Sequence, residues 1–343
     1  MEKILIVGSG VAGITLHHCM SQYVENVYLM DDFEVPSSTM VAAGMINPIT
    51  GRKFNLTWKY EELMPVFKEV YGQISATIGL DILSSMTLIR EIDTIENENQ
   101  IFSLGTPFIH SDHNTNPQIE EWFNAGISRV AIEAFRLHTS EMVEKYSRLL
   151  KSKGLFLNEK FDFAKLSMIE SKLKYKDQNF DRIIFCEGYA VVNNPFFRML
   201  PFQPVKGEVI IAKIPNLTLD VAYKNKLFFI PISPEIFWIG SGYEWSFNDS
   251  FPSEKGILEL VNKIKSVLKS DFEILETRAA IRPSTKHRKP IIGWHPQYKS
   301  IGVVNGLGTK GSMLAPYLAK MMTQSIFGIQ EIDEELNVHR FIQ

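Results

Sequence analysis

Hydrophobic residues near the start of the chain form two short runs, separated by a glycine-rich turn and a helical stretch. The continuous apolar run within 3–7 predicts a strand that is buried on both faces. The following pattern predicts a helix over about 12–22 and a second strand over 26–30. Strand, turn, helix and strand in this order are typical of the start of a doubly wound parallel sheet.

Helical and β-type patterns alternate along the next part of the chain. We expect hairpins and loops over 96–124, because this stretch is polar and contains proline and several asparagines. Elsewhere the periodicity predicts helices over 58–78, 139–152 and 253–268, and strands over 83–94, 129–136, 155–157, 172–175 and 182–186.

The stretch from 196 to 275 reads mainly as strands, and the C-terminal part returns to strand, turn and helix over 300–323. We therefore expect an α/β fold with a Rossmann-like nucleotide-binding domain and a β-rich substrate-binding domain. The β-rich stretch has predicted strands over 207–213, 226–232 and 237–242. We assign 1–80, 125–195 and 276–343 to the nucleotide-binding domain, and 81–124 and 196–275 to the substrate domain.

Composition and charge exclude several classes of protein. A chain of 343 residues exceeds the usual size of a single core, which favours two domains. The net charge of −3 gives no basic excess for binding nucleic acid, and two cysteines exclude a disulfide scaffold. No apolar run reaches membrane-spanning length and none resembles a signal peptide, so we expect a cytoplasmic protein without a membrane span.

The turn after the first strand has the spacing of a dinucleotide-binding fingerprint. Gly8 permits the tight turn, Gly10 lets the backbone approach a pyrophosphate, and Gly13 lets helix and strand pack closely. Val11 and Ala12 open the helix, whose N-terminus would face the anion. A tight turn that binds no ligand is the alternative.

Asp31 ends the second predicted strand, at the distance from the fingerprint where a ribose-binding acid is expected. A carboxylate there accepts hydrogen bonds from a ribose diol. Asp32 is the second choice, because strand alternation points its side chain the other way.

Two further segments are rich in small residues and would let a backbone approach a flat ligand. The first contains Ala42, Ala43, Gly44 and Met45; the second is the loop of Gly308, Thr309, Lys310, Gly311 and Ser312, directly before the last helix. The N–H groups at that helix start would face an electron-rich ligand. By itself the first segment fits an ordinary loop better, and the second is equally compatible with one.

Together these segments resemble the FAD-dependent D-amino acid oxidase superfamily, and they are most similar to its glycine oxidase and sarcosine oxidase branch. The resemblance rests on the glycine fingerprint with Asp31, on 42–45, on Arg282 with Pro283, and on 308–316. Residues 185–188 and 204–208 are similar to two further strands of the family, the first of which lies near the adenine of FAD. The resemblance implies FAD as cofactor, held by the three segments above together with Gly188.

The resemblance also implies how FAD is attached. Sarcosine oxidases bind their flavin covalently through a C-terminal cysteine, whereas this chain has only Cys19 and Cys186. We therefore expect non-covalent FAD. One departure is that Cys186 and Glu187 stand where the family often has two alanines, which leaves the contacts there open.

Three residues are implied as catalytic: Arg282, Tyr243 and Lys310. Arg282 would bind a substrate carboxylate with its guanidinium fork, or else form a structural salt bridge, and Arg278 is the competing clamp. Tyr243, with Trp245, would form an aromatic wall over the flavin or simply pack. Lys310 would contact the flavin or remain a solvated loop cation. Arg52 and Trp58 are further candidates for the site.

The activity implied is oxidation of the C–N bond of a small amino acid or secondary amine with a carboxylate, by hydride transfer to flavin N5. Alternatives are a D-amino acid dehydrogenase that reduces a quinone, an FAD enzyme that modifies the wobble uridine of tRNA, and a non-catalytic FAD-binding protein. The expected partner is a small amine, with no nucleic acid. The sequence leaves open whether the protein forms a homo-oligomer. No histidine has metal-type spacing, so we expect no metal site.

Overall fold

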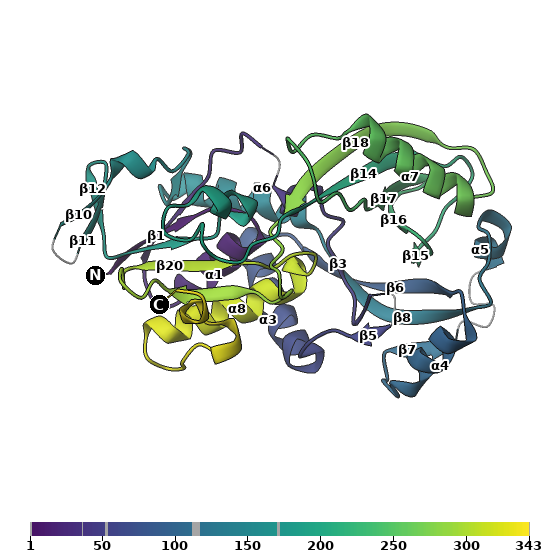
Figure 1. Ribbon diagram of the computed structural model, residues 1–343, viewed down its shortest axis with the longest axis horizontal. Coiled ribbons are helices and arrows are strands. Elements are labelled where there is room, and N and C mark those ends of the chain that lie inside the picture. Colours follow the sequence, from purple (N-terminus) through teal and green to yellow (C-terminus); the bar gives the residue numbers. More distant parts are fainter. Residues whose placement is uncertain (1, 36, 52–53, 112–116, 170–171, 343) are drawn as a thin grey trace.

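Two large sheets lie side by side along the long axis of the molecule (Figure 1). The computed structural model describes residues 2–35, 37–51, 54–111, 117–169 and 172–342. Both ends of the chain belong to the half that holds the first sheet, and the middle of the chain builds most of the second. The expected α/β fold class is confirmed.

The first sheet has six strands in the order β19-β20-β13-β1-β2-β9. Its central strand β1 pairs in parallel with both β2 and β13, whereas the edge strand β19 runs antiparallel to β20. The strands are β1 (Lys3–Val7), β2 (Asn26–Met30), β9 (Phe156–Leu157), β13 (Arg182–Phe185), β19 (Ile291–Trp294) and β20 (Ile301–Asn305).

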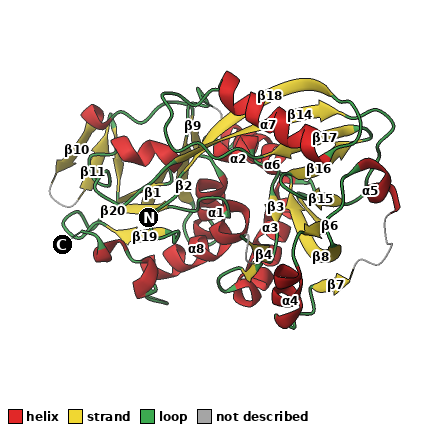
Figure 2. Cartoon of the chain, turned by 45° about the vertical axis from the view of Figure 1, so that its right-hand side comes forward, coloured by secondary structure: helices red, strands yellow, loops and turns green. Residues whose placement is uncertain are grey.

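Both faces of this sheet are covered, which explains the continuous apolar run of β1. Ile4 and Ile6 face a core formed with the helices, whereas Leu5 and Val7 face a core formed with a three-stranded meander. Helices α1 and α8 pack against each other on the first face (Figure 2). The helices are α1 (Val11–Met20), α3 (Tyr60–Ile78), α6 (Thr139–Ser152) and α8 (Gly311–Ile326), and the meander is β10 (Leu166–Ile169), β11 (Lys172–Tyr175) and β12 (Gln178–Phe180).

The second sheet has nine strands, with the order β18-β14-β17-β16-β15-β6-β8-β3 and with β7 paired to β8. Helix α7 (Glu254–Val267) packs on β14. The strands are β3 (Met45–Ile46), β6 (Leu83–Ile92), β7 (Ile109–Ser111), β8 (Ser128–Leu137), β14 (Val205–Lys213), β15 (Ala222–Lys224), β16 (Phe228–Ser233), β17 (Ile236–Gly240) and β18 (Glu273–Arg282).

The prediction of hairpins and loops over 96–124 is wrong in part. The structure has helix α4 (Ile95–Ser103), strand β7 and helix α5 (Pro117–Trp122) there. The Thr94 side chain accepts a hydrogen bond from the N–H of Asn97 and so caps α4, while Ile101 supplies its buried contact. One buried residue in nine gives too little periodicity to recognise a helix.

The domain boundaries we expected do not follow the sheets. Strands β8 and β18 belong to the nine-stranded sheet, although the boundaries at 125 and 276 put β8 and most of β18 in the nucleotide-binding domain. Smaller elements complete the chain: α2 (Ser38–Val41), β4 (Ile49–Thr50), β5 (Asn55–Leu56), and short helical turns at Phe163–Lys165, Gly188–Asn193, Glu334–Leu336 and Val338–Arg340.

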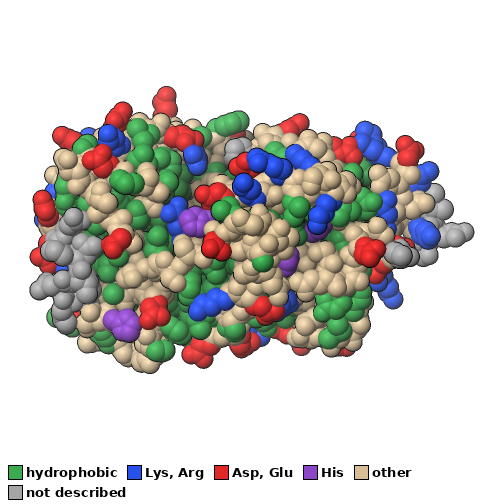
Figure 3. Space-filling model, turned by 180° about the vertical axis from the view of Figure 1, so that it is seen from behind, with side chains coloured by type: hydrophobic (Ala, Val, Ile, Leu, Met, Phe, Trp, Pro, Cys, Tyr) green, Lys and Arg blue, Asp and Glu red, His purple; other side chains and the backbone are tan. Residues whose placement is uncertain are grey.

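Charges of both signs are interspersed on the face of the molecule seen in Figure 3. That face presents no uniformly basic surface. Among the described residues, none of the helices combines the length and the apolar character that crossing a membrane requires.

Candidate active site

A cavity of about 1350 Å³ lies between the two sheets. It reaches the carboxyl ends of β1, β2 and β13, where ligands bind in open α/β sheets, and it extends over one face of the nine-stranded sheet. Nearly all the site residues expected from the sequence line it: Gly8, Gly10, Val11, Ala12, Asp31, Asp32, Ala42, Ala43, Gly44, Met45, Gly188, Tyr243, Arg282, Gly308, Thr309, Lys310, Gly311 and Ser312. Gly13 does not line the cavity.

The glycine turn has the close packing that its sequence predicts. Gly8 has φ +103°, and a Cβ there would lie 2.4 Å from the carbonyl oxygen of Cys186. A Cβ on Gly13 would lie 1.8 Å from the carbonyl oxygen of Gly8. Gly13 therefore holds the start of α1 against the turn. Val11 and Ala12 at this helix start line the cavity, and the Val11 N–H donates to the Thr39 hydroxyl at 3.0 Å.

Asp31 and Asp32 both line the cavity, so strand alternation does not separate them. Their hydrogen bonds distinguish the two carboxylates. One oxygen of Asp31 accepts from the N–H and the hydroxyl of Ser9, at 2.7 and 2.8 Å, and the other accepts from the N–H of Phe33. Asp32 accepts from the N–H of Glu34 on the outgoing loop. Asp31 is thus the carboxylate joined to the glycine turn.

The small-residue segment at 42–45 joins the two sheets. Gly44 has φ +75°, and a Cβ there would lie 1.8 Å from the carbonyl oxygen of Leu137 on β8. The N–H of Leu137 donates to the Gly44 carbonyl at 2.9 Å, so the chain enters β3 directly from this contact. The close approach of two backbones, rather than flexibility, is what requires glycine here.

The last loop before α8 forms another wall of the cavity. Lys310 stands at the N-cap of α8, and its ammonium lies 3.4 Å from the hydroxyl of Thr50. Burial lowers the pKa of Lys310, and Arg288 lowers it further. The positive end of α8 and the Lys310 side chain therefore give this wall a positive potential.

Arg282 is the last residue of β18, and its guanidinium is built into the cavity wall. It donates to the Ser241 hydroxyl at 2.6 Å and to the Gly242 carbonyl at 3.2 Å, and it lies 4.6 Å from the Tyr243 ring centre. A Cβ on Gly207 would lie 2.0 Å from the guanidinium, so glycine is needed beneath it.

Burial lowers the pKa of Arg282, although Tyr243 and Glu208 oppose that effect. Among the described residues, no carboxylate lies within ion-pair distance of the Arg282 guanidinium. A half-buried cation whose partners are a hydroxyl and a carbonyl is suited to receive an anion.

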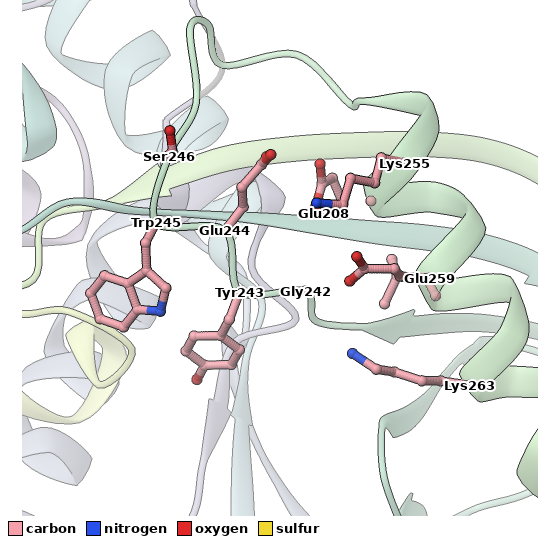
Figure 4. A pocket seen from close by; sticks show the side chains of 11 residues that line it. Glu208, Gly242, Tyr243, Glu244, Trp245, Ser246, Lys255, Glu259 and Lys263 are labelled. Carbon is pink, nitrogen blue, oxygen red and sulfur yellow. The ribbon is translucent and has the colours of Figure 1, made fainter.

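Tyr243 and Trp245 belong to the loop after β17 and are both more than half exposed. Their side chains point to the same side of the loop, whereas Glu244 points to the other (Figure 4). Tyr243 lines the large cavity and stacks on Arg282, but Trp245 lines only a smaller pocket of about 240 Å³.

Two of the five charged side chains that line that smaller pocket, Glu208 and Glu244, pair with Lys206. The Lys206 ammonium lies 2.9 Å from Glu244 and 3.7 Å from Glu208. Glu208 also accepts a hydrogen bond from the Ser253 hydroxyl at 2.9 Å, which fastens the start of α7 to β14. These contacts have a structural role.

The remaining candidates lie elsewhere. Arg278 pairs with Glu276 at 2.6 Å and does not line the cavity. Trp58 packs edge-on against Tyr317, also away from the cavity, and Arg52 falls outside the described residues. Within the described ranges, no three His, Cys, Asp or Glu side chains gather as a metal site would require.

Cys19 and Cys186 are both buried free thiols, and burial raises the pKa of each. Neither is therefore a thiolate nucleophile. Glu187, next to Cys186, lines the cavity just beyond the carboxyl end of β13. It accepts a hydrogen bond from the Asn194 side chain at 2.7 Å. Burial raises the pKa of Glu187 to about 7.

Several cavity residues were not found from the sequence, namely Ser241, Trp238, Phe228, Lys224 and Arg90. All lie on or directly after strands of the nine-stranded sheet. Alternation along β17 could have indicated Trp238. β15 has only three residues, too few to reveal which side chains share a face.

A family model described as "FAD dependent oxidoreductase" matches residues 3–325. Glycine oxidase from Bacillus licheniformis is 30% identical over 130 residues, which are 37% of this chain and 35% of that protein. Glycine oxidase from Geobacillus kaustophilus (strain HTA426) is 30% identical over 122 residues, which are 34% of this chain and 32% of that protein. The sequence matches thus span about a third of the length of these relatives.

Solved structures match over nearly the whole chain. Iminodiacetate oxidase from Chelativorans sp. BNC1 has a TM-score of 0.80 at 18% identity, covering 99% of this chain and 98% of that one. Glycine oxidase from Geobacillus kaustophilus has a TM-score of 0.79 at 18% identity, covering 99% and 97%. These likenesses show that the chain shares their fold.

Proposed function

Because the chain belongs to the FAD dependent oxidoreductase family, we propose that it oxidises the C–N bond of a small amine or amino acid that carries a carboxylate. The observation that carries the proposal is Arg282, a half-buried guanidinium that forms no ion pair with a carboxylate of the described residues and lies in the same cavity as the glycine turn. The partial likeness to glycine oxidases supports the same class of substrate.

The walls of the cavity fit FAD. A Cβ on Gly188 would meet no atom within 4 Å, so this glycine leaves the cavity open beside the turn. The first turn of α1 would hold the pyrophosphate and Asp31 the ribose. The loop from Gly308 to Ser312 and the start of α8 would hold the flavin end, where negative charge needs stabilisation. Bound FAD would supply the acceptor for a hydride.

The residues of the chain position the substrate for that transfer. The Arg282 guanidinium would donate charge-assisted hydrogen bonds to a substrate carboxylate, and its bonds to the Ser241 hydroxyl and the Gly242 carbonyl fix its orientation. Tyr243 covers the guanidinium and limits its access to water. The substrate carbon loses a hydride and its nitrogen a proton. The resulting imine is then hydrolysed by water to a carbonyl compound and the released amine.

The experiment that tests the proposal is anaerobic titration of the purified, FAD-containing protein, followed by its visible absorption. Glycine, sarcosine, D-alanine and iminodiacetate are compared with methylamine and ethylamine, which lack a carboxylate. We expect the flavin band to bleach with one or more of the carboxylate-bearing amines and not with the simple amines. Bound FAD that none of these amines reduces would support a non-catalytic FAD-binding protein instead.

A further inference from the structure

A second pair of cations lines the same cavity, on the nine-stranded sheet. Arg90 on β6 and Lys224 on β15 are register partners in a parallel strand pair, and both face the cavity. Neighbouring strands lie about 4.8 Å apart, so two positive side chains emerge next to each other from one face. We refer to Arg90 and Lys224 as the distal cation pair.

Each member of the distal cation pair is held by neutral groups. The Arg90 guanidinium donates to the Gly51 carbonyl at 2.7 Å and lies 3.8 Å from the Phe54 ring centre. The Lys224 ammonium donates to the Lys226 carbonyl at 3.1 Å and lies 4.4 Å from the Phe228 ring centre. These contacts orient the two cations without neutralising them.

The carboxylates nearby do not neutralise the distal cation pair. Glu91 is engaged elsewhere, because it accepts from the N–H of Gly126 at 2.7 Å and from the Tyr223 hydroxyl at 3.1 Å. Asp93 attracts Arg90 only from beyond ion-pair distance. In the part of the chain that the structure describes, no carboxylate forms an ion pair with either cation.

Partial burial and mutual repulsion make the distal cation pair unfavourable when no anion is present. Burial, Arg90 and Lys263 together lower the pKa of Lys224 to about 8. Burial also lowers the pKa of Arg90 to about 10. An anion bound between the two cations would relieve both effects, which is why perturbed cations in a cavity point to a binding site.

The surface between Arg282 and the distal cation pair is apolar. β18 and β15 are four strands apart in the sheet order, so their axes lie roughly 19 Å apart. The strand registers place Lys224 level with Arg278, so Arg282 lies four residues further along β18. The long side chains at both ends shorten that gap. Val209, Trp238, Phe228 and Ile230, on the strands between, line the cavity there. Such a surface suits a chain of methylene groups.

We infer that the distal cation pair binds a second anionic group of the substrate, remote from the C–N bond and from the carboxylate at Arg282. The inference rests on the proposed function and names its substrate class: an amino acid, or an N-substituted glycine, with an acid at the end of a chain of several carbons. The second acid is a carboxylate or a phosphate-type group, since the Arg90 guanidinium matches both.

The test compares pairs of N-substituted glycines of equal length on the FAD-containing enzyme. N-(carboxypropyl)- and N-(carboxypentyl)glycine are each measured against the corresponding N-alkylglycine, by the rate of anaerobic flavin reduction against concentration. We expect half-saturation at a concentration at least about tenfold lower for the acid-tailed member of one or both pairs. N-(phosphonopropyl)glycine distinguishes the two kinds of anion. Equal half-saturation within both pairs would overturn the inference.

Lys224→Met should abolish the preference for the acid tail, so that the acid-tailed and the N-alkylglycine of each pair reach half-saturation at the same concentration. Its melting temperature should stay the same or rise, because a partly buried cation without a counter-ion is removed. Lys213→Met is the matched control: Lys213 ends β14 of the same sheet, pairs with Glu235 at 3.6 Å, and does not line the cavity. An acid-tail preference that survives in Lys224→Met would overturn the inference.

A binding measurement separates this inference from the proposed function. Glutarate and inorganic phosphate are titrated against the FAD-containing parent enzyme and Lys224→Met by calorimetry. If no amine reduces the flavin, the proposed function fails, yet glutarate or phosphate that binds the parent and not the variant still supports the anion site. If neither anion distinguishes parent from variant and the acid tail gives no preference, the anion site is refuted.

Discussion

Asp31 and Asp32 are adjacent carboxylates on one cavity wall, yet only Asp31 is joined to the glycine turn through Ser9. Sequence position predicts Asp31 as the ribose-binding acid, because the fingerprint specifies an acid at the end of the second strand. The contacts around Arg282 were not predictable in the same way. Ser241 and Gly207 reach it only because β14, β17 and β18 pair in this order.

Asp31→Ala should weaken FAD binding by on the order of 1.5–3 kcal/mol, because a charge-assisted hydrogen bond to the ribose and the bonds to Ser9 are both lost. Asp32→Ala should change the affinity little, since its visible partner is the N–H of Glu34. The measurement is titration of each apoprotein with FAD. Equal affinities in the two variants would refute the assignment.

Glu187 gives the protein a specific pH dependence. Burial raises its pKa to about 7 from an ordinary value of about 4.5, so the folded state keeps a proton that the unfolded state has lost. Its stabilising contribution is complete below about pH 4.5 and is lost as the pH rises through about 7. Glu187→Gln imitates the protonated form, so the variant should not lose this contribution to stability as the pH rises.

From pH 4.5 to 8, the free energy of unfolding of the FAD-free parent should therefore fall by on the order of 2–3 kcal/mol relative to Glu187→Gln. Urea unfolding at both pH values measures the difference. A parent and a variant whose stabilities change in parallel with pH would argue against a buried carboxyl at this position.

Helix α1 and the strand before it form the element whose sequence pattern was most informative. The signal is local, since turn, helix and second strand follow one another within thirty residues. In contrast, the three-residue strand β15 and the polar helix α4 carry little local signal. Their positions are fixed by partners distant in sequence, such as the pairing of β15 with β6.

Gly13→Ala tests how the start of α1 is held. A Cβ there would lie 1.8 Å from the Gly8 carbonyl oxygen, so the helix must shift away from the turn. We expect the free energy of unfolding to fall by about 1–3 kcal/mol and FAD binding to weaken, although Gly13 does not line the cavity.

The matched control is Gly72→Ala within α3, where a Cβ would meet no atom within 4 Å. This change should raise the free energy of unfolding by roughly 0.5–1 kcal/mol, because alanine favours the helix. Thermal unfolding and FAD titration of both variants measure the effects. If both substitutions behaved alike, contact with the turn would not be the reason for glycine at position 13.

At the scale of the whole molecule, the cavity needs both ends of the chain and the sheet built from its middle. The alternation of strand-rich and helical stretches predicted this arrangement in outline, with a nucleotide-type pattern at each end. The sequence did not predict that β8 and β18 belong to the nine-stranded sheet, because both strands have ordinary patterns that fit either sheet.

The thiols of the whole chain also predict how FAD is attached. Cys19 and Cys186 are buried, and the raised pKa of each keeps it a thiol. Acid precipitation should therefore release all yellow colour into the supernatant. Colour that stays with the precipitated protein would mean a covalent link.

The measurement that tests the account most directly is the rate of anaerobic flavin reduction against substrate concentration in Arg282 variants, with an amine that reduces the parent. Arg282→Lys keeps the charge but loses the fork, so it should bind substrate markedly less well. Arg282→Ala should lose on the order of 3–5 kcal/mol of transition-state stabilisation, because the substrate carboxylate is left unpaired. FAD content should be nearly unchanged, and Arg278→Ala, outside the cavity, should react like the parent. An Arg282→Ala enzyme with the rate and half-saturation of the parent would contradict the account.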